Sequence, residues 1–180
     1  MGSCNSCPSK GTCGKDEQSC GIVNNPQNKI KNIIGVMSGK GGVGKSTMSV
    51  MIAKELAARG YQVGVLDADI TGPSIPRLFH IENERARGTE QLIYPVETAE
   101  GIKVMSLNLV VEKEDEAVIW RGPAITGIVN QFWTGVYWGE LDYLIIDMPP
   151  GTGDVPLTVM QSIPIKGVVM VSIPQDMISM

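Results

Sequence analysis

A glycine-rich segment at residues 39–46, GKGGVGKS, limits the folds open to this chain because it matches the pattern G-x4-G-K-[ST]. An apolar run at residues 33–37 precedes the segment and predicts a buried strand. The apolar residues Met48, Met51, Ile52 and Leu56 recur at helical spacing and predict a helix over residues 46–59. Glycines between a strand and a helix let backbone N–H groups turn toward phosphate oxygens, and the helix N-terminus adds partial positive charge. The segment therefore predicts a loop that binds nucleotide phosphates.

The side chains of this loop have separate expected roles. Lys45 should reach the β- and γ-phosphates, and the Ser46 hydroxyl should bind Mg²⁺. Lys40 is not required by an ordinary phosphate loop; it is either a solvated lysine or a group that reaches a nucleotide across a dimer interface. Gly151 lies in a second flexible loop and is expected to sense the γ-phosphate. The residues expected to contact ATP are Gly39, Lys40, Gly41, Gly42, Val43, Gly44, Lys45, Ser46, Thr47 and Gly151.

Aspartates end two further apolar runs. Asp147 follows the run at residues 141–146 and is expected to hold Mg²⁺ with Ser46. Asp67 and Asp69 follow the run at residues 63–66, and one of them is expected to orient the attacking water or to contact Mg²⁺. The competing interpretation is that these aspartates cap helices or turns.

The remaining pattern predicts the fold class. We expect strands at residues 92–95 and 102–107, a buried strand at 167–173, helices at 123–133 and 155–162, and a charged loop at 82–90. Trp120, Trp133 and Trp138 are expected in the core or at a dimer face. Continuous apolar strands alternating with helices predict a three-layer α/β fold, in which helices cover both faces of a mostly parallel sheet. Ligands of such sheets bind at the carboxyl ends of the strands.

All four cysteines, Cys4, Cys7, Cys13 and Cys20, lie in the first 20 of the 180 positions. No large apolar side chain lies between Gly2 and Gly21, so this segment cannot organise itself by burying a core. Four thiolates at these spacings suit zinc or an iron–sulfur cluster about equally, whereas disulfides need an oxidising compartment. We therefore expect a metal-binding tail and linker over residues 1–28 and one domain over residues 29–180.

Composition excludes several classes of function. Apolar residues form 43% of the chain and charged residues 19%, which is typical of a globular protein. The net charge of −4 argues against nucleic acid as a partner. No apolar run approaches the roughly 18 residues of a membrane span, and no signal peptide is visible, so we expect a cytoplasmic protein that does not bind membranes.

Four segments resemble a known family. Residues 39–47 resemble the deviant Walker A loop, K-G-G-x-G-K-[ST], of the MinD/ParA class of P-loop NTPases. Within that class, residues 67–76 (DADITGPSIP), 121–123 (RGP) and 141–154 (LDYLIIDMPPGTGD) resemble the Mrp/Nbp-type iron–sulfur carrier ATPases. The resemblance covers about residues 30–176.

The resemblance implies roles for residues at matching positions. Lys40 resembles the signature lysine of the class, Asp67 and Asp69 its switch I carboxylates, and Asp147 its Walker B residue, while residues 151–154 resemble switch II. The cysteines are similar to a cluster-binding tail, which favours a 4Fe-4S cluster over zinc. The implied function is a Mg²⁺-dependent ATPase, slow without a partner, that acts as a homodimer and passes iron–sulfur clusters to apoproteins.

The chain also departs from this family. Members continue beyond the position of Met180 with further strands and helices and a Cys-x2-Cys pair that holds a cluster between two subunits, so we expect this sequence to be a fragment. The main alternative is a MinD/ParA-like positioning or partition ATPase with a zinc-binding tail. Such a protein needs an amphipathic membrane helix or a basic DNA surface. Two other classes are a nucleotide-driven electron donor like nitrogenase reductase, which needs cysteines in the core, and a zinc-tailed binding module with a structural nucleotide.

Overall fold

The computed structural model describes residues 25–69, 72, 74–88, 92–110, 127, 131–151, 156–157, 159–160 and 163–174. The four cysteines, Trp120, the segment 121–123 and residues 152–154 lie outside this part of the chain.

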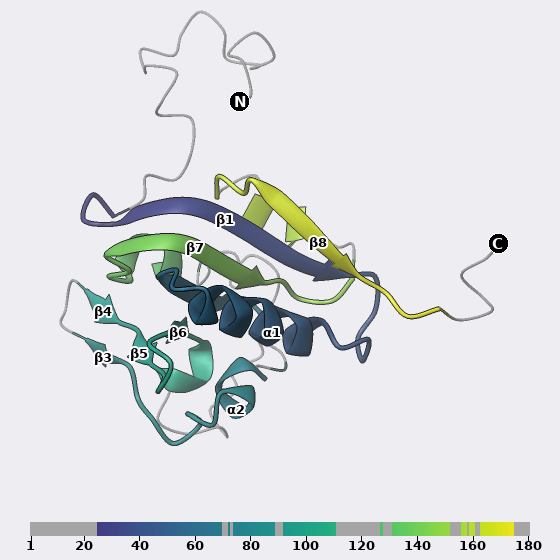
Figure 1. Cartoon of the computed structure of the whole chain (residues 1–180), viewed down its shortest axis with the longest axis horizontal. Helices are drawn as coiled ribbons and strands as arrows, with labels where there is room; N and C mark the ends of the chain where they lie inside the picture. The colour runs from purple at the N-terminus through teal and green to yellow at the C-terminus, as the bar shows by residue number, and fades with distance from the viewer. Residues whose placement is uncertain are drawn as a thin grey trace, which may run out of the picture.

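A six-stranded sheet in the order β5-β6-β2-β7-β1-β8 forms the centre of the described fold (Figure 1). Five neighbouring strands are parallel: β6 (Lys103–Met105), β2 (Val63–Asp67), β7 (Glu140–Asp147), β1 (Lys29–Ser38) and β8 (Gly167–Val171). Only β5 (Val96–Glu97) runs antiparallel, against β6. The predicted mostly parallel sheet is confirmed, and the inner strands read as continuous apolar runs because both of their faces are covered.

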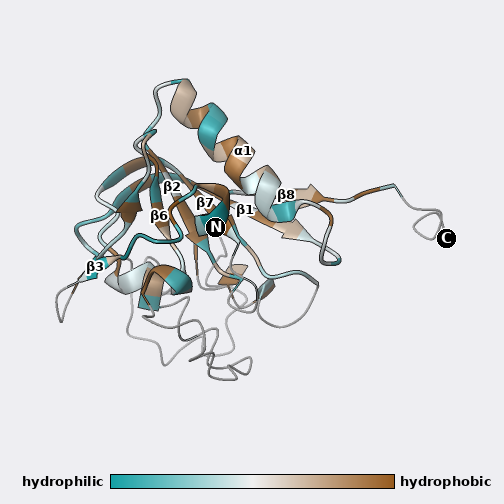
Figure 2. Ribbon diagram, turned by 90° about the horizontal axis from the view of Figure 1, so that it is seen from below, coloured by the Kyte–Doolittle hydropathy of each residue, from teal (hydrophilic) through white to brown (hydrophobic). Residues whose placement is uncertain are grey.

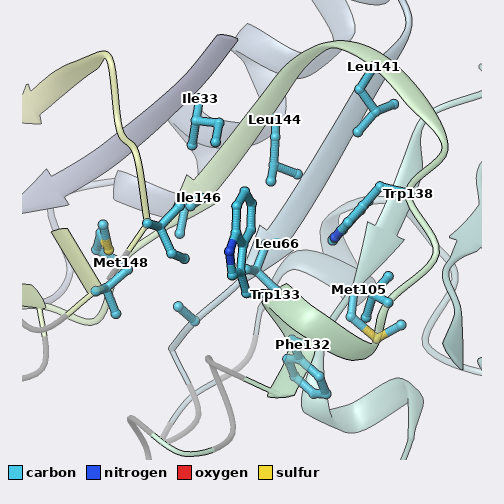
Figure 3. Close-up of a cluster of buried hydrophobic side chains, with 14 residues drawn as sticks. Ile33, Leu66, Met105, Phe132, Trp133, Trp138, Leu141, Leu144, Ile146 and Met148 are labelled. Atoms are coloured by element: carbon cyan, nitrogen blue, oxygen red, sulfur yellow. The ribbon is translucent and has the colours of Figure 1, made fainter. Parts of the chain in front are cut away.

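Helices lie on both faces of this sheet. Helix α1 (Lys45–Ala58) lies along one face, as Figures 1 and 2 show from two directions, and the short helix α2 (Ile75–Leu78) packs on the same side. Residues 131–135, which are helical, cover the opposite face. There Trp133 is 1% exposed and its ring lies beside Leu66 and Ile146 (Figure 3). Trp138 is fully buried in the same cluster, so the expectation that these two tryptophans pack in the core is confirmed.

Only half of the apolar series that predicted α1 faces the core: Ile52 and Leu56 are partly buried and pack against it. The buried residues of the helix are Lys45, Ser49, Val50 and Ala53, whereas Met48 and Met51 are 38% and 58% exposed. The helix bounds agree with the prediction to within one residue at each end. Two of these buried residues, Lys45 and Ser49, contact Asp147 at the end of β7.

Three predictions about the strands need correction. The strand expected at residues 92–95 forms only as β4 (Ile93–Tyr94), which pairs with β3 (Arg87–Gly88). It stops before Pro95, which has no N–H group for a strand ladder, and the unpredicted β5 follows and pairs with β6. The expected loop at 82–90 therefore contains β3. The expected buried strand at 167–173 forms as β8, but among the described residues β1 is its only partner strand, and Met170 is 62% exposed. In the described part of the chain, no helix is long and apolar enough to cross a bilayer.

Candidate functional site

The strand order brings three strand ends together. Strand β7 lies between β1 and β2, so Asp147 at its carboxyl end pairs in register with Val36 on one side and with Asp67 on the other. The loop at residues 39–44 follows β1 directly. The phosphate-loop residues and the two strand-end aspartates, far apart in the sequence, therefore meet at one edge of the sheet, where parallel sheets bind ligands.

The loop has the backbone that a phosphate cradle requires. Gly42 and Gly44 have φ values of 75° and 88°, in the left-handed region that favours glycine. Gly44 is the N-cap of α1, and no side chain caps the helix there. The first N–H groups of the helix can therefore donate hydrogen bonds to an anion. The Ser38 hydroxyl donates to the Lys40 carbonyl at 3.0 Å, and the Gly151 N–H donates to the Ser38 carbonyl at 2.9 Å. The first bond lies within the phosphate loop, and the second holds the loop at Gly151 against the end of β1.

Lys45 and Asp147 form a buried ion pair. The Lys45 Nζ lies 2.7 Å from Asp147 Oδ2, and the two side chains are 7% and 0% exposed. The Ser46 hydroxyl donates to the same Oδ2 at 2.6 Å, and the Ser49 hydroxyl donates to Oδ1 at 2.7 Å. Two hydroxyl groups and one ammonium group therefore compensate a carboxylate that has no contact with water.

Both carboxyl oxygens of Asp67 accept hydrogen bonds from neighbouring groups of the chain. Oδ1 accepts the Asp69 N–H at 3.1 Å, and Oδ2 accepts the Ser106 hydroxyl at 3.2 Å and the Ile75 N–H at 3.4 Å. Burial, with the neighbouring charge of Asp147, raises the pKa of Asp67 to about 8. The Asp67 carboxyl thus bonds the backbone at Asp69, just after β2, and at Ile75, where α2 begins.

Asp69 lies closer to Lys45. Its Oδ2 lies 4.0 Å from Lys45 Nζ, and its side chain is 14% exposed. Asp67, the last residue of β2, is 1% exposed, so Asp69 is the aspartate with access to solvent beside the ammonium group of Lys45.

The structure places the other predicted residues as follows. Val43 is buried and anchors the loop, whereas Thr47 is exposed on α1; the exposed loop residues are Gly39, Lys40, Gly41, Gly42 and Gly44. The roles expected for the four cysteines fall outside the described residues. Sequence reasoning missed Ser49 and Ser106, which hold the two strand-end aspartates. Ser49 had a sequence signal, because it is four positions after Lys45 and therefore on the same face of the helix.

The donor set at the strand ends fits Mg²⁺. The Ser46 hydroxyl and the Asp147 carboxylate are hard oxygen groups 2.6 Å apart, and Mg²⁺ in nucleotide sites takes few protein ligands beside phosphate and water. In the part of the chain that the structure describes, no three His, Cys, Asp or Glu side chains form a separate metal cage. The chemistry here suits a metal that arrives with a nucleotide.

Comparisons with known proteins identify the family of this chain. The sequence profile of the NUBPL iron-transfer P-loop NTPases, a ParA group, matches residues 29–180. A Clostridium perfringens protein named iron-sulfur cluster carrier protein is 54% identical over 100% of this chain, which covers 68% of that protein. A protein of the same name from Methanocaldococcus jannaschii is 47% identical over 97% of this chain and 62% of its own length. The chain thus spans about two thirds of these relatives.

Solved structures show the same relationship. A nucleotide-binding protein of Archaeoglobus fulgidus in complex with ADP is 48% identical, with a TM-score of 0.71 over 82% of this chain and 56% of that one. The septum site-determining protein MinD of Pyrococcus horikoshii is only 19% identical, with a TM-score of 0.57 over 82% of this chain and 59% of that one, and shares the fold alone. On the profile match and the relatives together, this chain belongs to the NUBPL iron-transfer family of P-loop NTPases.

Proposed function

We propose that this protein binds and hydrolyses ATP with Mg²⁺ and carries iron–sulfur clusters to apoproteins. The observation that carries the proposal is the convergence of Lys45 and Ser46 on the buried carboxylate of Asp147, beside a glycine loop at a helix N-terminus. The ADP complex of the Archaeoglobus relative supports nucleotide binding. The names of the Clostridium and Methanocaldococcus relatives support the cluster cargo.

The geometry suggests how the residues divide the work on ATP. Loop N–H groups from Gly39 to Thr47 and the Lys45 ammonium bind the phosphates, and Ser46 and Asp147 hold Mg²⁺, which neutralises charge on the phosphate oxygens. To reach the phosphates, Lys45 exchanges its ion pair with Asp147 for phosphate contacts. The Gly151 N–H, now bonded to Ser38, is the group placed to respond to the γ-phosphate.

We assign the orientation of the attacking water to Asp69 and the support of the turn to Asp67. Asp69 is partly exposed beside Lys45, whereas both oxygens of Asp67 accept hydrogen bonds from the protein.

The active form in this proposal is a homodimer in the cytoplasm. Lys40 is exposed on the loop, as a residue that reaches the nucleotide of a second subunit must be. A positive group supplied from a partner in this way stabilises the charge that develops during phosphoryl transfer. In this proposal, the switch segments become ordered or disordered with the nucleotide state. This change alters the dimer geometry and thereby the retention of the cluster.

The cysteine tail is the proposed cluster site, with Cys4, Cys7, Cys13 and Cys20 as thiolate ligands of a 4Fe-4S cluster. We place the division between this tail with its linker and the ATPase domain at residues 28 and 29. The alternative of a positioning ATPase with a zinc tail has less support, because the MinD structures that match are below 25% identical. The relatives at 46–54% identity are named iron-sulfur cluster carrier proteins.

The decisive experiment measures what the tail binds. The chain is purified without oxygen, reconstituted with iron and sulfide, and analysed for iron, acid-labile sulfide and zinc. A Cys7→Ser/Cys13→Ser variant is compared with a Ser6→Ala/Ser9→Ala control, which changes two polar residues in the same segment. Because residues 21–180 contain no cysteine, a cluster with thiolate ligands must use the tail.

We expect near-equal iron and sulfide in the parent chain and the control, and loss of both in the cysteine variant. ATP binding should persist in all three proteins, because the nucleotide site lies in the other domain. Transfer to an apo-ferredoxin, followed by its visible absorbance, then tests the carrier activity. Zinc without sulfide, or no metal after reconstitution, would overturn the cluster proposal and leave the nucleotide proposal standing.

A further inference from the structure

We infer that Ser49 is a positioning residue for the magnesium site: it anchors one oxygen of Asp147 so that the other oxygen faces the phosphate loop. This inference rests on the proposed nucleotide function. It assigns a role to a residue in the second turn of α1 that belongs to neither the glycine loop nor a switch segment.

The first argument is the division of contacts on the carboxylate. Oδ2 accepts Lys45 and Ser46, which are the two groups expected to turn toward a nucleotide. Oδ1 accepts Ser49 at 2.7 Å, and no other side chain in the described residues donates to that oxygen. The exchangeable contacts and the fixed contact are therefore on different oxygens.

The second argument is that the Ser49 side chain is too buried to move when a ligand binds. Its side chain is fully buried, and it is on the inner face of α1 between the helix backbone and strand β7. Its hydroxyl also lies 3.2 Å from the Lys45 carbonyl, one helical turn earlier. A hydroxyl has one proton to donate, and the shorter hydrogen bond, to the charged Asp147 carboxylate, is stronger than the one to the Lys45 carbonyl. Ser49 therefore donates to Asp147 and remains in place when Lys45 moves.

The third argument is energetic. Residues that orient a metal ligand through a hydrogen bond commonly change metal affinity by about 10–100-fold when they are removed. Without Ser49, Asp147 can rotate toward the remaining donors on the loop, and Oδ2 no longer has a fixed direction. The expected defect is thus in Mg²⁺ binding and not in the affinity for the nucleotide alone.

The test compares Ser49→Ala with Ser106→Ala in the full chain. Both serines are fully buried, and each donates to a strand-end aspartate, but Ser106 bonds Asp67. A fluorescent, slowly hydrolysed ATP analogue is bound in EDTA, and Mg²⁺ is then titrated into the saturated complex. We expect Ser49→Ala to raise the Mg²⁺ concentration at half-saturation about 10-fold, with analogue affinity in EDTA within about twofold of the parent. Ser106→Ala should leave the Mg²⁺ titration unchanged.

A double-mutant comparison separates positioning from general damage. If Ser49 acts through Asp147, adding Ser49→Ala to Asp147→Asn produces no further change in the Mg²⁺ titration. A lower unfolding midpoint with an unchanged Mg²⁺ titration would overturn the inference, since it would make Ser49 purely structural. Failure of the parent chain to bind the analogue would instead overturn the proposed nucleotide function, and the inference with it.

Discussion

The buried pair of Lys45 and Asp147 predicts a large stability effect from a nearly isosteric change, Asp147→Asn. At an effective dielectric constant of about 20, unit charges separated by the observed 2.7 Å attract by roughly 6 kcal/mol. Desolvation of both groups offsets much of this attraction, and removal of one partner from a buried pair typically costs about 3–5 kcal/mol. Asp69, 4.0 Å from the Lys45 ammonium, compensates part of the loss. We therefore expect a loss near the lower end, about 3 kcal/mol.

Urea unfolding followed by circular dichroism, in EDTA and without nucleotide, measures this loss. The measurement is made at pH 6, below the Asp67 pKa of about 8, so that Asp67 is neutral and relief of its repulsion by Asp147 contributes little. For a domain of this size, about 3 kcal/mol corresponds to a fall of roughly 6–12 °C in the thermal midpoint. The matched control is Glu140→Gln, which breaks an ion pair of the same 2.7 Å length whose side chains are 76% and 77% exposed. We expect no measurable change from it.

A second variant shows whether the loss comes from the unpaired ammonium group. Lys45→Met combined with Asp147→Asn removes both charges, and it should be more stable than Asp147→Asn alone. Full stability of Asp147→Asn, or a double variant no better than the single one, would show that the ion pair does not compensate a buried charge in solution.

Three further predictions concern the core, the pH dependence and the loop. Gly64→Ala places a Cβ 2.7 Å from Leu141 Cδ1 and should cost about 1–3 kcal/mol by urea unfolding, whereas Gly135→Ala, with no described atom within 4 Å, should not destabilise. Because the Asp67 pKa is about 8 in the folded chain and near 3.8 when unfolded, the folded state holds an extra proton between these values. Stability should therefore fall by about 1.4 kcal/mol per unit as pH rises from 5 to 8, relative to Asp67→Asn, and a parallel pH profile would contradict this. Lys40→Ala should lower ATP hydrolysis by about 10³-fold or more with an unchanged unfolding midpoint.

Much of the nucleotide site could be located from local sequence signals. The glycine loop, the strand before it and the helix after it depend on backbone conformation and apolar runs that are adjacent in the chain. Asp67 and Asp147 were found for the same reason, as polar residues that end apolar runs. Strand β5 shows the limit of such signals, because a strand was predicted at residues 92–95 only, whereas the chain makes a second one after Pro95 that pairs with a different partner.

What the sequence by itself determined is therefore that Asp67 and Asp147 end apolar strands and that a glycine loop joins a strand to a helix, since these follow from local periodicity and glycine conformation. Only the tertiary structure decided that β7 lies between β1 and β2, which sets Asp147 against Lys45, Ser46 and Ser49. It also decided that Asp67 is buried, with a raised pKa, while Asp69 keeps access to solvent. The exposure of β8 and of Met51 on α1 likewise depends on which neighbours cover them. Strand order and burial arise from long-range packing, and no single segment of the chain contains that information.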